Sequence, residues 1–183
     1  FAVLLAGMPL LAQRHKLTIN AETPEGQLLQ QIGQEADAAK KTTLMEEFTQ
    51  KHATHEGMGW VLEQLVAAHL KANQFDKVLE TGGKLLAMDP SDVATAHSCL
   101  KAAEGKKDPA LIKEWAAKTS ELAKKAVAAP KPSDEEEAES WKANVDYAKQ
   151  VDTYTEYSLY AAAVAAQDPN HKILLIEALQ ARN

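Results

Sequence analysis

Apolar residues recur at intervals of three and four positions along almost the whole chain after residue 20. This spacing gathers them on one side of an α-helix, and no stretch sustains the alternation with period two that a half-buried strand shows. The pattern therefore predicts an all-α protein. The expected helices are 24–37, 40–52, 57–72, 75–88, 92–104, 109–127, 134–150, 153–167 and 171–181.

Several of these helices begin with residues that favour a helix start. Thr23-Pro24 and Asp108-Pro109 each offer a side-chain oxygen that can cap the helix, followed by a proline at the first helical position. Ser133 and Glu136 have the spacing of a capping box, and the acidic run around them suits the positive end of a helix dipole. Connections are short, so neighbouring helices are expected to run antiparallel.

One order of residues occurs twice along the chain. Phe75 begins a helical run that closes at Asp89-Pro90, and Tyr154 begins another that closes at Asp168-Pro169. The two prolines are 79 residues apart, which equals two periods of about 34 residues plus an insertion of about 11. The acidic, proline-rich stretch 129–139 has the length of that insertion. We therefore expect a repeated helical hairpin.

Alignment on the two prolines divides the chain into blocks with similar residues at matching positions. The blocks are 24–56, 57–92, 93–128 and 138–171, with a partial block at 172–183. The second block places apolar residues on two successive helices, at Leu62, Leu65, Val66, Phe75, Val78 and Leu85. In the fourth block the expected packing residues are Trp141, Val145, Tyr154, Tyr157, Ala161 and Val164, and the tract 160–167 is expected to form a close-packing face.

This order of residues resembles the tetratricopeptide repeat, in a degenerate form that is also similar to exported bacterial repeat proteins. The resemblance covers roughly residues 24–181, although Val66, Leu100 and Val145 stand where the family usually has a small residue. It implies an α-α superhelix, a right-handed solenoid of antiparallel hairpins. Each hairpin in such a fold buries its apolar face against the next one.

The resemblance also implies a concave groove lined by the first helix of each hairpin. The residues expected to point into it are Trp60, Glu63, Ala67, Lys71, Ala94, His97, Lys101, Glu139, Lys142 and Asp146. Their mixed charge suits an extended peptide or a partner helix, with Trp60 as an aromatic anchor. The alternatives are a solvated face without a ligand and, for Trp60, a packing role between first helices.

Charge and cysteine content exclude several kinds of partner. The 183 residues carry a net charge of −6 without a basic stripe, so nucleic acid is not an expected partner. The single cysteine, Cys99, allows neither an internal disulfide nor a cysteine-based zinc site. It falls on a packing position and is expected to be a small buried hydrophobe.

The sequence contains no convincing catalytic group. His52, His55 and Glu56 lie close together but between two expected helices, and a zinc site needs ligands that are held on one face. His97 and Cys99 are two positions apart and point to different sides of a helix. Gly82 and the glycine after it lie inside a helix, which indicates close approach of a neighbouring helix or a slight kink. We therefore predict no enzyme, no cofactor and no metal.

Residues 1–12 carry no polar side chain and are too short to span a membrane, which needs roughly 20 apolar residues. They fit the hydrophobic part of a secretory signal, with a cut ahead of Gln13 and an extension over 13–23. The alternatives are a buried N-terminal helix and a lipid-facing anchor. The signal interpretation predicts an extracytoplasmic protein, periplasmic or secreted.

Two functions remain open from the sequence. The favoured one is a non-catalytic scaffold that holds a segment of another protein in its groove. The other is a helical accessory domain of a larger exported or membrane-associated enzyme or assembly.

Overall fold

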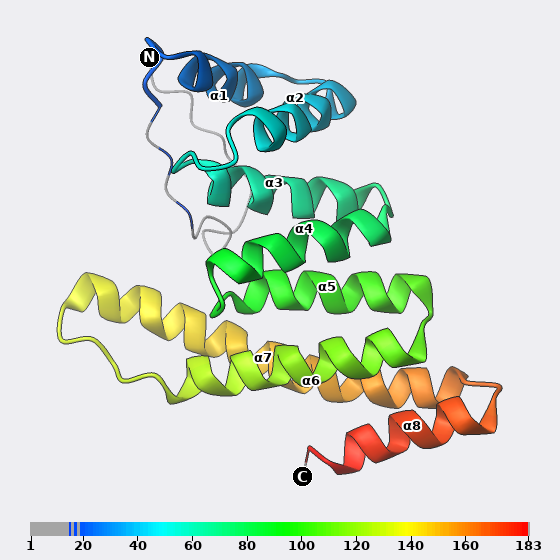
Figure 1. The fold of residues 1–183 in the computed structure, drawn as a ribbon. Helices are drawn as coiled ribbons and strands as arrows, with labels where there is room; N and C mark the ends of the chain where they lie inside the picture. The colour runs from blue at the N-terminus through cyan, green and yellow to red at the C-terminus, as the bar shows by residue number, and fades with distance from the viewer. Residues whose placement is uncertain (1–14, 16, 18, 183) are drawn as a thin grey trace.

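Eight α-helices follow one another in the computed structural model, which describes residues 15, 17 and 19–182 (Figure 1). They are α1 (Pro24–Gln34), α2 (Ala38–Lys51), α3 (Met58–Lys71), α4 (Phe75–Met88), α5 (Val93–Lys106), α6 (Pro109–Ala128), α7 (Glu135–Ala165) and α8 (Pro169–Gln180). The described part of the chain contains no strand, so the predicted all-α class is confirmed. The proposed signal segment 1–12 and its cleavage point lie outside the described residues.

The helices form a stack in which each one packs against its neighbour in sequence. In addition α3 contacts α5, and α5 contacts α7, so alternate helices share one side of the stack. The starts of α1, α3 and α5, at residues 24, 58 and 93, are separated by intervals of 34 and 35 residues. This is the superhelical arrangement that the sequence predicts.

The expected helix starts at Thr23 and Asp108 are confirmed. Thr23 Oγ1 accepts a hydrogen bond from the Gly26 amide at 3.1 Å, and Asp108 Oδ1 accepts from the amides of Ala110 and Leu111 at 2.9 and 3.1 Å. The capping box predicted at Ser133 is wrong by one residue. Asp134 caps α7 instead, because its Oδ1 accepts a hydrogen bond from the Glu137 amide at 3.0 Å.

The largest difference from the predicted elements is α7. The expected helices 134–150 and 153–167 are one continuous helix of 31 residues. No glycine or proline interrupts this segment, and the position of the expected break is tied to the core by buried Val151. The hairpin predicted for the block 138–171 is therefore a single long helix followed by the turn into α8.

The two Asp-Pro pairs used to align the blocks are not equivalent. Asp89 ends α4, whereas Asp168 caps the start of α8 and Pro169 is the first residue of that helix. The match to Asp168-Pro169 is instead Asp108-Pro109, which starts α6 in the same way. A proline at the first helical position loses no hydrogen bond, so the pair favours a helix start.

The core consists of successive clusters along the stack. One joins α1 to α4 around Leu29, Phe48, Val61 and Leu85, and another joins α4 to α8. The second cluster includes Leu86, Ala96, Leu100, Ile112, Trp115, Leu159 and Leu175. Because the adjacent residues Leu85 and Leu86 belong to different clusters, α4 has packed neighbours on two sides.

The predicted insertion at 129–139 corresponds to the end of a long hairpin that extends beyond the other helices (Figure 1). It comprises the connection after α6 and the first turn of α7. Ala123 of α6 packs against Ala148 and Val151 of α7. Nearer the tip, Trp141 Nε1 donates a hydrogen bond to the Ala129 carbonyl at 3.1 Å. The extra residues therefore form the loop of this hairpin and the first turn of α7.

Within the described residues, no helix combines the length and the apolar character needed to cross a bilayer.

Candidate functional site

The predicted groove residues of α3 differ in exposure. Ala67 and Lys71 are exposed, and Glu63 is half-buried. Trp60 is also half-buried and packs against the cluster that joins α1 to α4. These contacts fit the alternative in which Trp60 is a packing residue. Its role as an anchor for a ligand stays a prediction.

On α5, His97 lies in the junction with α7, whereas Ala94 and Lys101 are exposed. His97 Nδ1 is 3.1 Å from the Tyr147 hydroxyl, and the imidazole meets the Tyr154 ring edge to face at 4.8 Å between centroids. Burial, with a smaller contribution from the charge of Lys101, lowers the pKa of His97 to about 4. The ring is therefore neutral near pH 7 and joins two helices.

The predicted groove residues of α7 lie on an exposed face that is longer than expected. Glu139, Lys142 and Asp146 are exposed, and the same side of the helix continues through later positions at intervals of three, four and seven. We call these positions the α7 outer face: Lys142, Asp146, Gln150, Thr153, Tyr157, Tyr160 and Val164.

The second half of the α7 outer face is apolar. Tyr157, Tyr160 and Val164 are 63, 58 and 62% exposed. The packing role predicted for Tyr157 and Val164 is therefore wrong. That prediction followed from dividing α7 into two helices, because the division placed these residues on the wrong face. Reading 135–165 as one helix, which its lack of glycine and proline supports, would have aligned them with Lys142 and Asp146.

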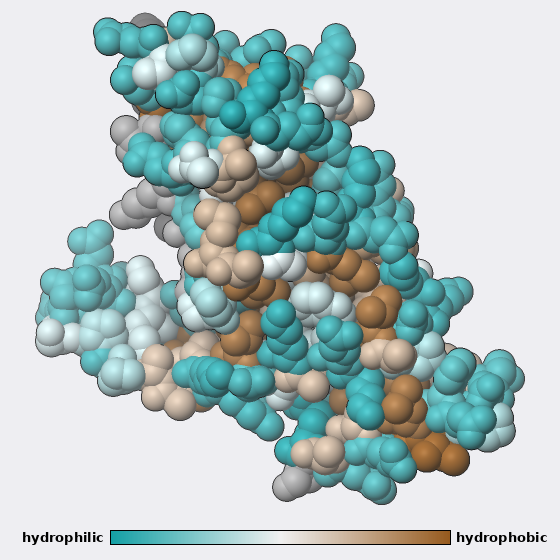
Figure 2. Space-filling view, in the orientation of Figure 1, coloured by the Kyte–Doolittle hydropathy of each residue, from teal (hydrophilic) through white to brown (hydrophobic). Residues whose placement is uncertain are grey.

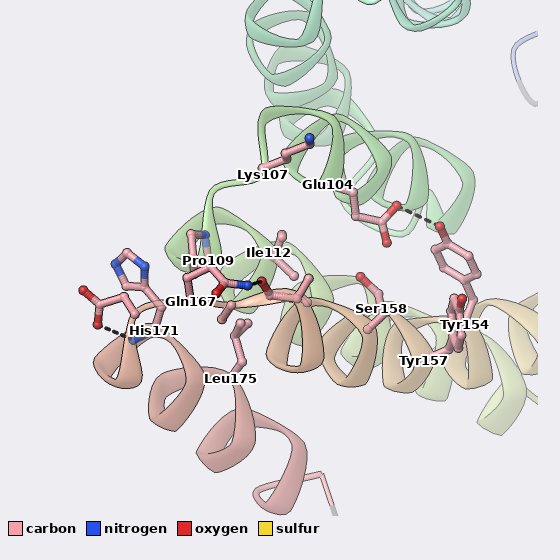
Figure 3. Close-up of a pocket in the computed structure, with 15 residues that line it drawn as sticks. Glu104, Lys107, Pro109, Ile112, Tyr154, Tyr157, Ser158, Gln167, His171 and Leu175 are labelled. Atoms are coloured by element: carbon pink, nitrogen blue, oxygen red, sulfur yellow. Dashed lines mark hydrogen bonds between the residues drawn. The ribbon is translucent and has the colours of Figure 1, made fainter.

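A pocket of about 740 Å³ lies beside this face, where α5 passes into α6 and α7 passes into α8 (Figure 3). Its walls are mostly small or apolar residues. They include Pro109 and Ile112 from α6, Ala161, Ala162 and Ala165 from α7, and Leu175 from α8. Part of the alanine tract expected to be a close-packing face thus lines a pocket, while Ala163 is buried in the core as expected.

One end of the pocket is aromatic. Tyr154 and Tyr157 come from α7, with ring centroids 6.3 Å apart. The Tyr154 hydroxyl donates a hydrogen bond to Glu104 Oε2 of α5 at 2.8 Å. Burial and the hydrogen bond to Glu104 raise the pKa of Tyr154 well above its usual value, so this hydroxyl remains a donor near pH 7.

The other end of the pocket carries charged residues. His171 lies there with Asp168 at the start of α8, whereas Lys107 lies at the end of α5 (Figure 3). Asp168 Oδ1 accepts hydrogen bonds from the amides of Asn170 and His171, which lower the pKa of the carboxyl. Neither Lys107 nor His171 forms an ion pair with any residue that the structure describes.

Ser158 forms part of the wall and is 3% exposed. Its Oγ has no hydrogen-bond partner among the described residues. A buried hydroxyl without a partner costs free energy, and the Thr119 hydroxyl in the core shares this feature.

Apolar residues also reach the surface over part of α8, among hydrophilic ones (Figure 2), and Ile173 and Ile176 of this helix are exposed. Leu175 on the opposite side of the helix is fully buried, and Ala178 and Leu179 pack beside it.

The residues considered for catalysis or metal binding have other surroundings. Cys99 is fully buried, and burial raises the pKa of its thiol to about 12, so it is protonated near pH 7. The expectation of a small buried hydrophobe is confirmed. His52 and His55 both pack on the Phe48 ring, and no metal-binding group of three ligands occurs in the described ranges.

Comparisons of the chain with protein families, with curated proteins and with solved structures find no match.

Proposed function

We propose that this protein is a non-catalytic interaction scaffold of tetratricopeptide-like type, which binds an amphipathic helix of a partner protein along the α7 outer face. The observation that carries the proposal is the exposure of Tyr157, Tyr160 and Val164 in a row on one helix. Large apolar side chains gathered on one exposed face commonly mark sites of protein interaction.

The length and chemistry of the face favour a helical partner. From Lys142 to Val164 it extends about 33 Å at 1.5 Å per residue, which matches a partner helix of about six turns. Its apolar half offers two aromatic anchors, and the half that carries Lys142 and Asp146 offers charges of both signs. An amphipathic helix with apolar residues toward one end fits this arrangement.

The groups that could have suggested an enzyme support the same proposal. The His97 ring is packed between α5 and α7, and the Cys99 thiol is buried and protonated. Neither is positioned to react with a substrate. Export across a membrane is part of the proposal on the pattern of residues 1–12 alone.

Site-specific photocrosslinking in the native host tests the proposal. Tyr160 is replaced by p-benzoylphenylalanine, and the matched control places the same group at Glu80, an exposed position on α4. We expect a discrete protein adduct from position 160 and none from position 80. Mass spectrometry of the adduct then maps the partner segment, which should be helical when bound.

A second variant links the adduct to the apolar half of the face. Tyr157→Glu with Val164→Glu changes two exposed residues and should leave the circular dichroism spectrum unchanged, while the adduct is lost. The proposal fails if positions 160 and 80 give the same adducts, or if the crosslinked molecule is a second copy of this chain.

A further inference from the structure

Two residues near the N-terminus lie directly against the start of α3. A Cβ atom added at Gly59, in the first turn of this helix, would be 2.7 Å from His15 Nδ1. One added at Gly57, the residue that precedes the helix, would be 2.8 Å from Leu17 Cδ1. Each glycine therefore leaves a space that a side chain from the N-terminal segment fills. We call Gly57 and Gly59 the α3 glycine pair.

The backbone conformation does not require glycine at these two positions. Gly57 has φ −73° and ψ −2°, which other residues adopt readily, and Gly59 is helical. Alanine favours a helix more than glycine does, so Gly59 lowers the stability of α3. In α1, by contrast, no described atom lies within 4 Å of a carbon added at Gly33. The close approach of neighbouring side chains is thus what the α3 glycine pair permits.

The contact has the form in which proteins recognise extended peptides. Leu17 packs against the apolar cluster that joins α1 to α4, as does Trp60, the predicted groove anchor. Residues two positions apart in an extended chain point to the same side, so the spacing of His15 and Leu17 lets both dock together. Separate spaces for alternate side chains give such sites their specificity.

The contact with the N-terminal segment is not fully satisfied. His15 and Leu17 are only half-buried, and His15 Nε2 is buried without a hydrogen-bond partner among the residues that the structure describes. An unpaired buried nitrogen costs free energy, which weakens the attachment of this segment. An equivalent segment supplied from outside could therefore replace it.

We propose that the start of α3 is a docking site for an extended protein segment with a histidine and, two residues later, a leucine. The chain's own His15 and Leu17 occupy this site as an intramolecular ligand, which shields the apolar cluster until it is displaced. The site involves α3 and not the α7 outer face, so the inference does not depend on the proposed partner helix.

Binding of a synthetic peptide to the full chain tests this inference. The probe has the sequence of residues 13–19, with blocked ends and a fluorescent label, and its anisotropy is measured. It is titrated with the parent chain and with the variant that combines His15→Ala and Leu17→Ala. A tethered ligand has an effective concentration of about 1 mM, so a peptide with a Kd of about 100 µM should bind the parent about tenfold more weakly than the variant.

A matched peptide and two matched variants locate the bound probe. Exchange of the histidine and the leucine keeps the charge and composition of the peptide and should weaken its binding at least about tenfold. In the His15→Ala, Leu17→Ala background, Gly59→Leu fills the space on α3 and should abolish binding. Gly33→Leu, at an exposed position of α1, should leave binding unchanged.

The inference is overturned if the His15→Ala, Leu17→Ala variant shows no saturable binding, or if the parent binds the peptide equally well. Equal binding of the exchanged peptide, or full binding after Gly59→Leu, would also contradict it. Circular dichroism confirms that each variant is folded. Tyr157→Glu with Val164→Glu should not affect the peptide, which separates this site from the α7 outer face.

Discussion

Gly82 on α4 lies directly against the sulfur of Cys99 on α5. A Cβ atom at position 82 would be 2.4 Å from Cys99 Sγ, closer than two such atoms can lie, and Cys99 is fully buried. The adjacent Gly83 has no neighbouring atom within 4 Å of the same added carbon. One glycine of the pair therefore permits the close approach of two helices, as the sequence suggested, and the other does not.

This contrast predicts opposite effects of the same substitution. Gly82→Ala should lower the free energy of unfolding by about 1 to 2 kcal/mol, because overpacking outweighs the better helix propensity of alanine. Gly83→Ala should raise it by up to about 1 kcal/mol, because only the propensity changes. Urea denaturation measures both values.

Removal of the sulfur provides the control. In a Cys99→Ala background, Gly82→Ala should no longer be destabilising, because the clash partner is gone. If Gly82→Ala stabilises the original protein as much as Gly83→Ala does, α4 and α5 are not in the contact described.

At the scale of elements, the continuity of α7 determines where its functional residues lie. Val151 is buried against α6, and Asp152 accepts hydrogen bonds from Ser120 Oγ at 2.5 Å and from Arg182 Nη2 at 2.9 Å. The region predicted to be a break between helices is thus one of the most firmly held parts of the hairpin. It joins α6 and α7 to the end of α8.

Proline substitution distinguishes a continuous helix from a linker at this point. Gln150→Pro should lower the free energy of unfolding by about 3 kcal/mol or more, because it removes a hydrogen bond in the middle of a helix and clashes with the preceding turn. Glu135→Pro, at the first position of the same helix, should be nearly neutral. Chemical denaturation of both variants measures the difference, and a neutral Gln150→Pro would contradict a continuous α7.

The sequence correctly predicted the helices whose bounds are set by neighbouring residues along the chain. Helix Phe75–Met88 has the expected bounds, and the Asp108-Pro109 start is confirmed, because capping and periodicity depend only on nearby residues. The pocket could not be predicted in this way. It needs Glu104 and Tyr154, which are 50 positions apart, to meet across two helices. The block alignment failed there because it treated Asp89 and Asp168 as equivalent corners.

At the scale of the whole molecule, helices that are far apart in sequence share few contacts, so stability should be local. Phe48→Ala removes a fully buried ring from the cluster that joins α1 to α4, a change that typically costs about 3 to 5 kcal/mol. Hydrogen exchange should accelerate in α1 to α3 and remain nearly unchanged in α7 and α8.

The reciprocal variant is Leu159→Ala, which alters the cluster at the other end of the stack. It should loosen α6 to α8 and leave α1 and α2 protected. Uniform loss of protection in either variant would indicate one cooperative core in place of a stack.

The unbroken course of α7 has a mechanical consequence. Its 31 residues make a rod of about 46 Å that carries the acidic hairpin tip at one end and a wall of the pocket at the other. The rod is held from Val151 to Ala163 by side chains buried in the core, whereas its first turns project beyond the other helices (Figure 1). A force on the tip is therefore resisted along this whole buried segment before it reaches the wall of the pocket.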